Sequence, residues 1–162
     1  MKINRALLKD GVPFSKSEEV IFKGINFDQN HVKSIPHCVV NMTATEFEGI
    51  LRVELEINAL VIAVCSYSLE DTELKFKINE ELNFTDDPDD ENSLYESGNE
   101  IDLDPYILEF ILGRVPLKVV KKGAKRPKNG DGYRVLTEDE YLEEEKHKTD
   151  PRWDILDNVK IK

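Results

Sequence analysis

The stretch Ala63–Phe84, AVCSYSLEDTELKFKINEELNF, decides the fold of this chain. Its second half alternates strictly between two kinds of side chain. One parity is apolar (Leu74, Phe76, Ile78, Leu82 and Phe84) and the other is polar (Glu73, Lys75, Lys77, Asn79, Glu81 and Asn83). This pattern predicts a strand with one buried face and one face in water. The first half, Val64–Asp71, ends another apolar strand and turns the chain into this one.

The strand that precedes this turn shows the longest alternation in the sequence. Every second residue from Leu51 to Cys65 is apolar. The opposite face is polar from Arg52 to Asn58 and apolar from Leu60 to Val64, which predicts a second half covered on both faces. Together with the alternating segment Cys38–Ala44 and a turn near Thr45–Gly49, these strands predict a three-stranded antiparallel meander.

Patterns before and after the meander are shorter. Ile3, Leu7 and Leu8 suggest one face of a short helix, and Val20–Phe22 suggests an edge strand. Downstream, Asp104 is a plausible N-cap, Pro105 fits the first helical position, and Gly113 and Pro116 end the helix. This helix has almost no polar face, so we expect it to pack deep in the core. Leu117, Val119 and Val120 suggest one more strand.

The C-terminal part carries a capping box, Thr137-Glu138-Asp139-Glu140, in which Thr and Glu satisfy each other's backbone donors. We expect a strongly acidic helix over about Glu138–Lys148. Asp150-Pro151 restarts a short helix, in which Trp153 is interpreted as a packing anchor.

These patterns predict an α+β fold: an antiparallel β-meander packed by a buried helix, with a helical C-terminal tail. We expect a single α+β domain over residues 1–136 and the helical tail over residues 137–162. Residues 85–100 are interpreted as a mobile acidic loop without regular elements, and residues 121–132 as a basic loop.

The charge is unevenly distributed along the 162 residues. The net charge of −11 argues against wholesale coating of nucleic acid, which requires many phosphate-neutralising cations. The run Arg114–Arg134 nevertheless holds eight basic residues and one acidic residue, so the remainder carries −18. No apolar run is long enough to span a membrane and the start lacks a signal-peptide core, which predicts a soluble cytoplasmic protein.

Catalytic and metal-binding patterns are missing from the sequence. The two cysteines, Cys38 and Cys65, lie in apolar strand patterns and lack the paired spacing of a zinc site. Cys65 shares the parity of Val61 and Ala63, so we interpret it as a packing residue rather than a reactive thiol. We therefore expect no enzyme, no cofactor and no bound metal.

Three segments in order resemble the YceD family of bacterial large ribosomal RNA subunit accumulation proteins. The first is the Cys-to-Phe hairpin that contains Cys65, Ser68, Leu69, Glu70 and Phe84. The second runs from Ile101-Asp102-Leu103 through the apolar helix to Val115-Pro116-Leu117, and the third is Asp150-Pro151-Arg152 followed by Trp153 and Leu156. We expect the signature residues to be structural: Cys65, Leu69, Glu70, Asp102, Pro116, Asp150, Pro151 and Arg152.

One departure from the family pattern concerns metal. Many members carry a Cys-rich cluster after the Leu-Pro pattern, whereas Lys118–Pro127 contains no thiol here. The chain thus resembles the cysteine-free branch, which also shows a run like Val135–Tyr141. Zinc ligation is not carried over.

The resemblance implies a non-enzymatic ribosome biogenesis factor that supports 23S ribosomal RNA accumulation or 50S assembly. One mechanism is direct contact with ribosomal RNA or a pre-50S particle through the basic loop, with Tyr133 available for stacking. Its candidate residues are Arg114, Lys118, Lys121, Lys122, Lys125, Arg126 and Lys128. The alternative is an acidic adaptor or chaperone for a basic ribosomal protein or a processing factor. The oligomeric state is left open.

Overall fold

The computed structural model describes residues 1–25, 27, 31–125 and 128–147 of the chain. Contacts divide the chain into two compact units, Met1–Ala124 and Lys125–Lys162. The boundary predicted from sequence, after residue 136, lies further along the chain. The predicted restart of a helix at Asp150-Pro151 and the packing of Trp153 lie outside the described residues.

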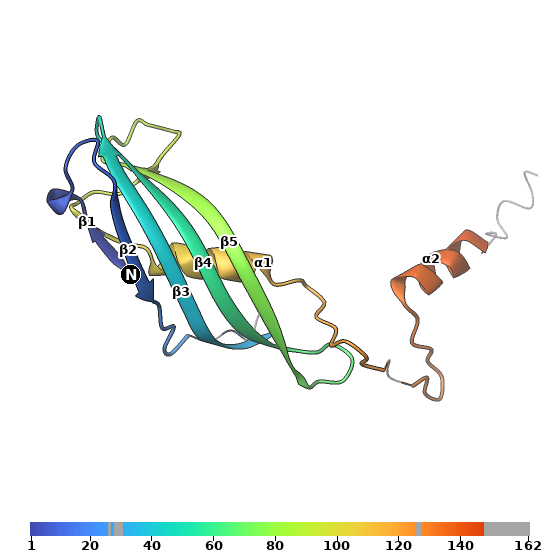
Figure 1. Cartoon of the computed structure of the whole chain (residues 1–162). Coiled ribbons are helices and arrows are strands. Elements are labelled where there is room, and N and C mark those ends of the chain that lie inside the picture. The colour runs from blue at the N-terminus through green and yellow to red at the C-terminus, as the bar shows by residue number, and fades with distance from the viewer. Residues whose placement is uncertain (26, 28–30, 126–127, 148–162) are drawn as a thin grey trace, which may run out of the picture. The chain divides into compact units, whose positions relative to one another are not determined.

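The first unit contains the predicted antiparallel meander (Figure 1). Its strands are β3 (Val32–Phe47), β4 (Ile50–Val64) and β5 (Asp71–Thr85). An edge strand, β2 (Phe14–Glu19), pairs with β3, and a short strand, β6 (Leu94–Tyr95), pairs in parallel with the end of β5. The sheet order is β2-β3-β4-β5-β6, so the predicted α+β class is confirmed.

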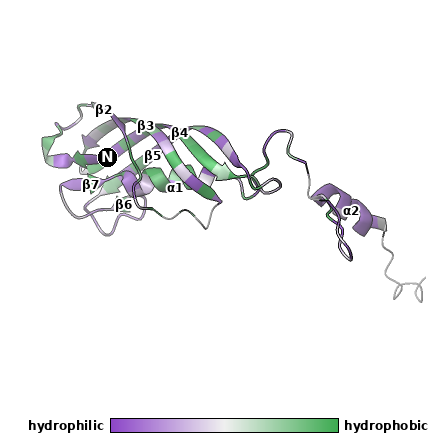
Figure 2. Ribbon diagram, turned by 90° about the horizontal axis from the view of Figure 1, so that it is seen from below, coloured by the Kyte–Doolittle hydropathy of each residue, from purple (hydrophilic) through white to green (hydrophobic). Residues whose placement is uncertain are grey.

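Burial follows the alternation that the sequence predicts. The apolar parity of β4, from Leu51 to Ala63, is buried throughout. We call the side of the sheet that carries it the inner face. The opposite, outer face bears exposed or half-buried side chains, and Figure 2 shows the two kinds of residue alternating along the strands. Leu60, Ile62 and Val64 are half-buried on this face, so the second half of β4 is covered only in part on its outer side.

Two elements cover the inner face. Helix α1 (Asp104–Arg114) buries Ile107 and Ile111 completely, while its other apolar residues are partly buried against the same core. Beside it, β1 (Lys2–Asn4) and β7 (Glu100–Asp102) form a two-stranded antiparallel sheet that buries Ile3 and Ile101. The buried helix of the prediction is confirmed.

Several local predictions need correction. Ile3 belongs to β1 rather than to a helix, and only Arg5–Leu7 forms a 3₁₀ turn, with Leu7 80% exposed. The edge strand precedes Val20 instead of containing it. The acidic segment 85–100 contains β6, and its last residue begins β7. In each case the structure is decided by pairing with another strand, and no local pattern in the sequence indicates such pairing.

The ends of α1 differ from the prediction as well. The N-cap is Leu103 rather than Asp104, because the Asp102 carboxylate accepts the free backbone N–H of Asp104 at 3.1 Å. After the helix, the predicted strand over Leu117–Val120 does not form. Val119 is buried, whereas Leu117 is 95% exposed.

The second unit contains α2 (Glu138–His147). The predicted capping box is confirmed by two reciprocal bonds. Thr137 N–H donates to Glu140 Oε2 at 2.9 Å, and Glu140 N–H donates to Thr137 Oγ1 at 3.2 Å. Figure 2 shows the hydrophilic character of this helix. None of the helices that the structure describes is long and apolar enough to cross a membrane.

The packing of Phe84 yields a test of this core. Its fully buried ring lies edge-to-face on Tyr106, with centroids 5.4 Å apart. We predict that Phe84→Ala lowers the free energy of unfolding by about 3–5 kcal/mol, since the cavity cannot close fully. Phe47→Ala, at a side chain that is 56% exposed, should cost less than about 1 kcal/mol. Urea denaturation measures both, and equal costs would contradict this placement of the core.

Candidate functional site

The turn after β4 is closed around Cys65. The Cys65 N–H donates to Glu70 O, and the Leu69 N–H donates to Cys65 O, both at 2.9 Å. Leu69 adopts a positive φ of 57° and leaves its side chain 78% exposed. Three family-signature residues, Cys65, Leu69 and Glu70, therefore shape this turn.

The run Arg114–Arg134, which we call the basic segment, is attached to this turn near its start by backbone hydrogen bonds. The Ser66 N–H donates to Val119 O at 2.8 Å, and the Lys121 N–H donates to Cys65 Sγ at 3.3 Å. Val119 is 2% exposed beneath these bonds. Although no strand forms, Val119–Lys121 is thereby fixed against the end of the sheet.

The two cysteines are both buried and yet have opposite acidities. The backbone N–H of Lys121, followed by hydrogen bonds from Ser68, lowers the pKa of Cys65 to about 6. Desolvation raises the pKa of Cys38 to about 11. The predicted burial of Cys65 is confirmed, because its exposed fraction is 0%. Its environment favours a thiolate that has no access to solvent.

The other signature residues have local roles. The Asp102 carboxylate accepts the backbone N–H of Asp104 at the start of α1, as described above. Pro116 follows the C-cap residue Val115 and cannot continue the helix, because proline lacks a backbone donor. Asp150, Pro151 and Arg152 lie outside the described residues.

The seven candidate RNA-binding residues divide between the two units of the chain. In the first unit, Arg114 binds Glu80 at 2.8 Å and Lys121 binds Glu70 at 2.9 Å. Lys118 Nζ lies 4.8 Å from the centre of the Tyr67 ring. Lys122 is exposed and has no carboxylate partner among the described residues. Lys125 and Lys128 are exposed in the second unit, and Arg126 lies outside the described residues.

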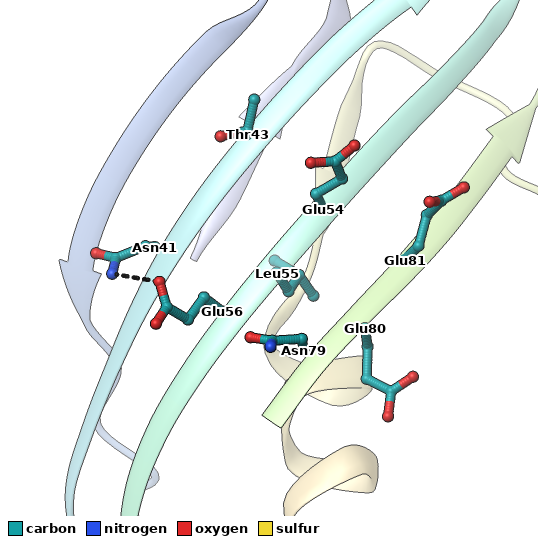
Figure 3. Close-up of a pocket in the computed structure, with 8 residues that line it drawn as sticks. All are labelled: Asn41, Thr43, Glu54, Leu55, Glu56, Asn79, Glu80 and Glu81. Carbon is teal, nitrogen blue, oxygen red and sulfur yellow. Dashed lines mark hydrogen bonds between the residues drawn. The ribbon is translucent and has the colours of Figure 1, made fainter. Parts of the chain in front are cut away.

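Glu80 is a residue whose role the alternation did not reveal. It interrupts the apolar parity of β5, and Figure 3 shows it turned away from Glu81 on the next position. Its partner Arg114 comes from the last turn of α1. The sequence does contain a signal for this ion pair. Glu80 is an acidic residue at a position of the apolar parity, and a charge in such a place needs a nearby cation.

The outer face carries a second group of charged residues, over the hollow in Figure 3. Arg52 binds Glu81 at 2.5 Å and lies 3.5 Å from Glu54, while Lys77 binds Glu56 at 2.7 Å. Asn41 also donates to Glu56, at 3.4 Å. These are exposed ion pairs on an open sheet face. Among the described residues, no group of three or more His, Cys, Asp or Glu side chains is arranged to hold a metal ion.

The first unit is a small two-layer α+β domain with an open, charged sheet face, and the backbone of Val119–Lys121 is fixed at one end of its central strand. The chain belongs to the YceD family, because the family model described as large ribosomal RNA subunit accumulation protein YceD matches residues 53–160. The resemblance drawn from the sequence is thus confirmed, and it connects the chain with ribosome biogenesis. No curated protein and no solved structure matches the chain.

The acidity of Cys65 generates a test of the turn. Its pKa is depressed from the ordinary 9.0, so the stability it contributes is fully present above about pH 9 and is lost as the pH falls through about 6. We predict that the difference in unfolding free energy between wild type and Cys65→Ala grows as the pH rises from 6 to 9. Urea midpoints at a series of pH values measure it.

Cys38→Ala provides the control for this experiment. Because the Cys38 pKa is raised, its contribution is fully present below about pH 9 and is lost as the pH rises through 11. The corresponding difference for Cys38 should be constant from pH 6 to 8. A pH-independent difference for Cys65 would mean that its thiol is not stabilised as an anion.

Proposed function

We propose that the protein is a non-enzymatic cytoplasmic factor that supports large-subunit ribosomal RNA accumulation by contacting RNA or a pre-50S particle through its basic segment. The observation that carries this proposal is the attachment of Val119–Lys121 to the Cys65 turn, which presents Lys118, Lys121 and Lys122 from a fixed backbone. A fixed backbone reduces the ordering entropy that a loose basic loop would lose on binding.

The side chains around this backbone suit phosphate and base contacts. Lys122 offers an exposed ammonium group, and Lys118 lies over the half-buried ring of Tyr67. Cations beside an aromatic ring are a common arrangement in single-strand binding sites. Lys121 is paired with Glu70, so a phosphate must displace that carboxylate. We therefore expect a modest affinity that depends strongly on salt.

A second candidate function is that of an acidic adaptor for a basic ribosomal protein or a processing factor. The open outer face favours it, since Glu54, Glu56 and Glu81 lie there without a covering element in the first unit. Their cationic partners are exposed and can be exchanged for those of a binding protein at low cost.

The proposal is one of binding rather than catalysis. Cys65 has the lowered pKa of a nucleophile, but its sulfur is closed to solvent. The carboxylates of the outer face are held in ordinary exposed ion pairs, which differ from the desolvated pairs of acid–base sites.

Charge reversal tests the RNA contact. We predict that the triple variant Lys118→Glu, Lys121→Glu, Lys122→Glu weakens binding to a large-subunit ribosomal RNA fragment. The slope of log K against log salt should fall by about 2, because each lost phosphate contact on a single strand contributes about 0.7. Fluorescence anisotropy over a potassium chloride series measures both quantities.

Matched variants distinguish a specific RNA-binding site from an effect of the net charge of the protein. Reversal of Lys9, Lys23 and Lys75, which are exposed elsewhere in the first unit, changes the net charge equally and should leave the slope unchanged. A separate variant of Lys125, Arg126 and Lys128 tests three of the four remaining candidates. Equal behaviour of the first triple and the control would exclude this RNA contact.

The cellular role is tested by depletion followed by sedimentation of ribosomal particles. We predict reduced 50S particles on depletion, and unaltered 50S levels would refute the proposed role. Pull-down of the tagged protein with and without nuclease then distinguishes the mechanisms. Partners lost on nuclease treatment favour RNA contact, whereas partners that survive favour the adaptor.

A further inference from the structure

The tip of the β3–β4 hairpin presents an apolar pair to solvent. Phe47 and Ile50 are directly opposite each other in the ladder and flank the turn Glu48-Gly49. Both turn residues have positive φ, 50° and 81°, as a tight two-residue hairpin requires. Phe47 is 56% exposed and Ile50 is 41% exposed, both on the outer face.

The tip is held rigidly from the opposite side. Arg5 binds both carboxylate oxygens of Glu46, at 3.0 and 2.5 Å, and also donates to Gly49 O at 3.0 Å. Fork-shaped bonds of this kind fix the geometry of both partners. The apolar pair is therefore preorganised, which lowers the entropy lost when a partner docks on it.

The acidic segment lines one side of a hollow that also contains Phe47 and Ile50. Its residues there are Asp90, Asn92 and Ser93. The segment is shaped by its own turns: the Asp89 N–H donates to Asp87 Oδ1 at 3.0 Å and the Asn92 N–H donates to Asp90 Oδ1 at 2.9 Å. The bond from Asn92, followed by that from Ser93, lowers the pKa of Asp90, because both bonds favour its charged carboxylate.

The charges that line this hollow are mostly negative. Among the described residues that line it, Glu48, Glu81 and Asp90 contribute carboxylates, and Arg52 contributes the single cation. Arg52 is already bound to Glu81 and lies near Glu54. An excess of carboxylates around an aromatic side chain repels nucleic acid and attracts a cationic segment that also carries apolar groups.

We propose that this hollow, the tip groove, binds an extended Lys- or Arg-rich segment of another protein. An apolar side chain of that segment packs on Phe47 and Ile50, and flanking cations pair with Glu48 and Asp90. The proposal rests on the adaptor function and gives it a site, at the end of β4 opposite to the Cys65 turn.

Labelled peptides test the tip groove in the full-length protein. The probes are a short peptide of lysine pairs separated by leucines, the same peptide with serine for leucine, and the same peptide with glutamate for lysine. We expect the lysine–leucine peptide to bind at least about tenfold more tightly than either of the others, because burial of one apolar side chain contributes about 1.5 kcal/mol or more. Fluorescence anisotropy measures the dissociation constants.

Variants locate the binding. Phe47→Ser and the double variant Glu48→Lys, Asp90→Lys should each weaken binding of the lysine–leucine peptide about tenfold. Ile50→Ser checks the apolar contact independently. Matched controls are Leu117→Ser, at another exposed apolar side chain, and Glu73→Lys, Glu143→Lys, at exposed carboxylates outside the groove. The controls should change the affinity less than about twofold.

The tip groove would be overturned by equal binding of the leucine and serine peptides, or by equal losses of affinity in groove and control variants. Competition by a ribosomal RNA fragment that is abolished by Phe47→Ser would also overturn it, in favour of a nucleic-acid site. Sedimentation after depletion judges the cellular role separately. If the peptide experiments fail but depletion still reduces 50S particles, only the tip groove is rejected. If depletion leaves 50S levels normal, the proposed function is rejected.

Discussion

Burial of one face along the whole of β4 is the constraint on which the rest of the structure depends. A shift of its register by one residue would carry Arg52, Glu54 and Glu56 into the core, where unpaired charges cost several kcal/mol each. The register is therefore strongly specified, and it also fixes what lies at the two ends of the strand. The hairpin tip precedes Ile50, and the Cys65 turn follows Val64. Both proposed contact surfaces inherit their geometry from the packing of a single strand.

The sequence predicted those parts of the fold that rest on local periodicity or capping. The alternation from Leu51 to Cys65 gave the correct buried face, and the Thr137 capping box gave the start of α2. Elements that rest on distant pairing were missed. The strand β1 forms because its partner β7 lies near the other end of the unit, and the polar edge strand β2 needs only a ladder with β3. Neither condition leaves a pattern in neighbouring residues.

The candidate site shows the same division. Sequence parity predicted that Cys65 is buried, which is confirmed, but parity says nothing of the donors around a sulfur atom. Cys38 lies inside the ladder, where desolvation, reinforced by the charges of Asp104 and Glu19, raises its pKa. Cys65 stands at the end of a strand, where the backbone N–H groups of Ser68 and Lys121 have no ladder partner and turn towards the thiol. The contact between two segments that lie 56 residues apart creates this difference.

The net charge of −11 is a poor guide to what the protein binds, because the charges are separated in space. The 15 residues of β4 span about 50 Å at roughly 3.3 Å per residue. At physiological ionic strength the Debye length is about 8 Å, so surfaces at the two ends of the strand are screened from each other. Lys118 and Lys122 at the Cys65 turn and the carboxylates of the tip groove therefore keep potentials of opposite sign. An RNA phosphate at one end and a cationic protein segment at the other would not compete for the same charges, so the two proposed contacts are compatible in one molecule.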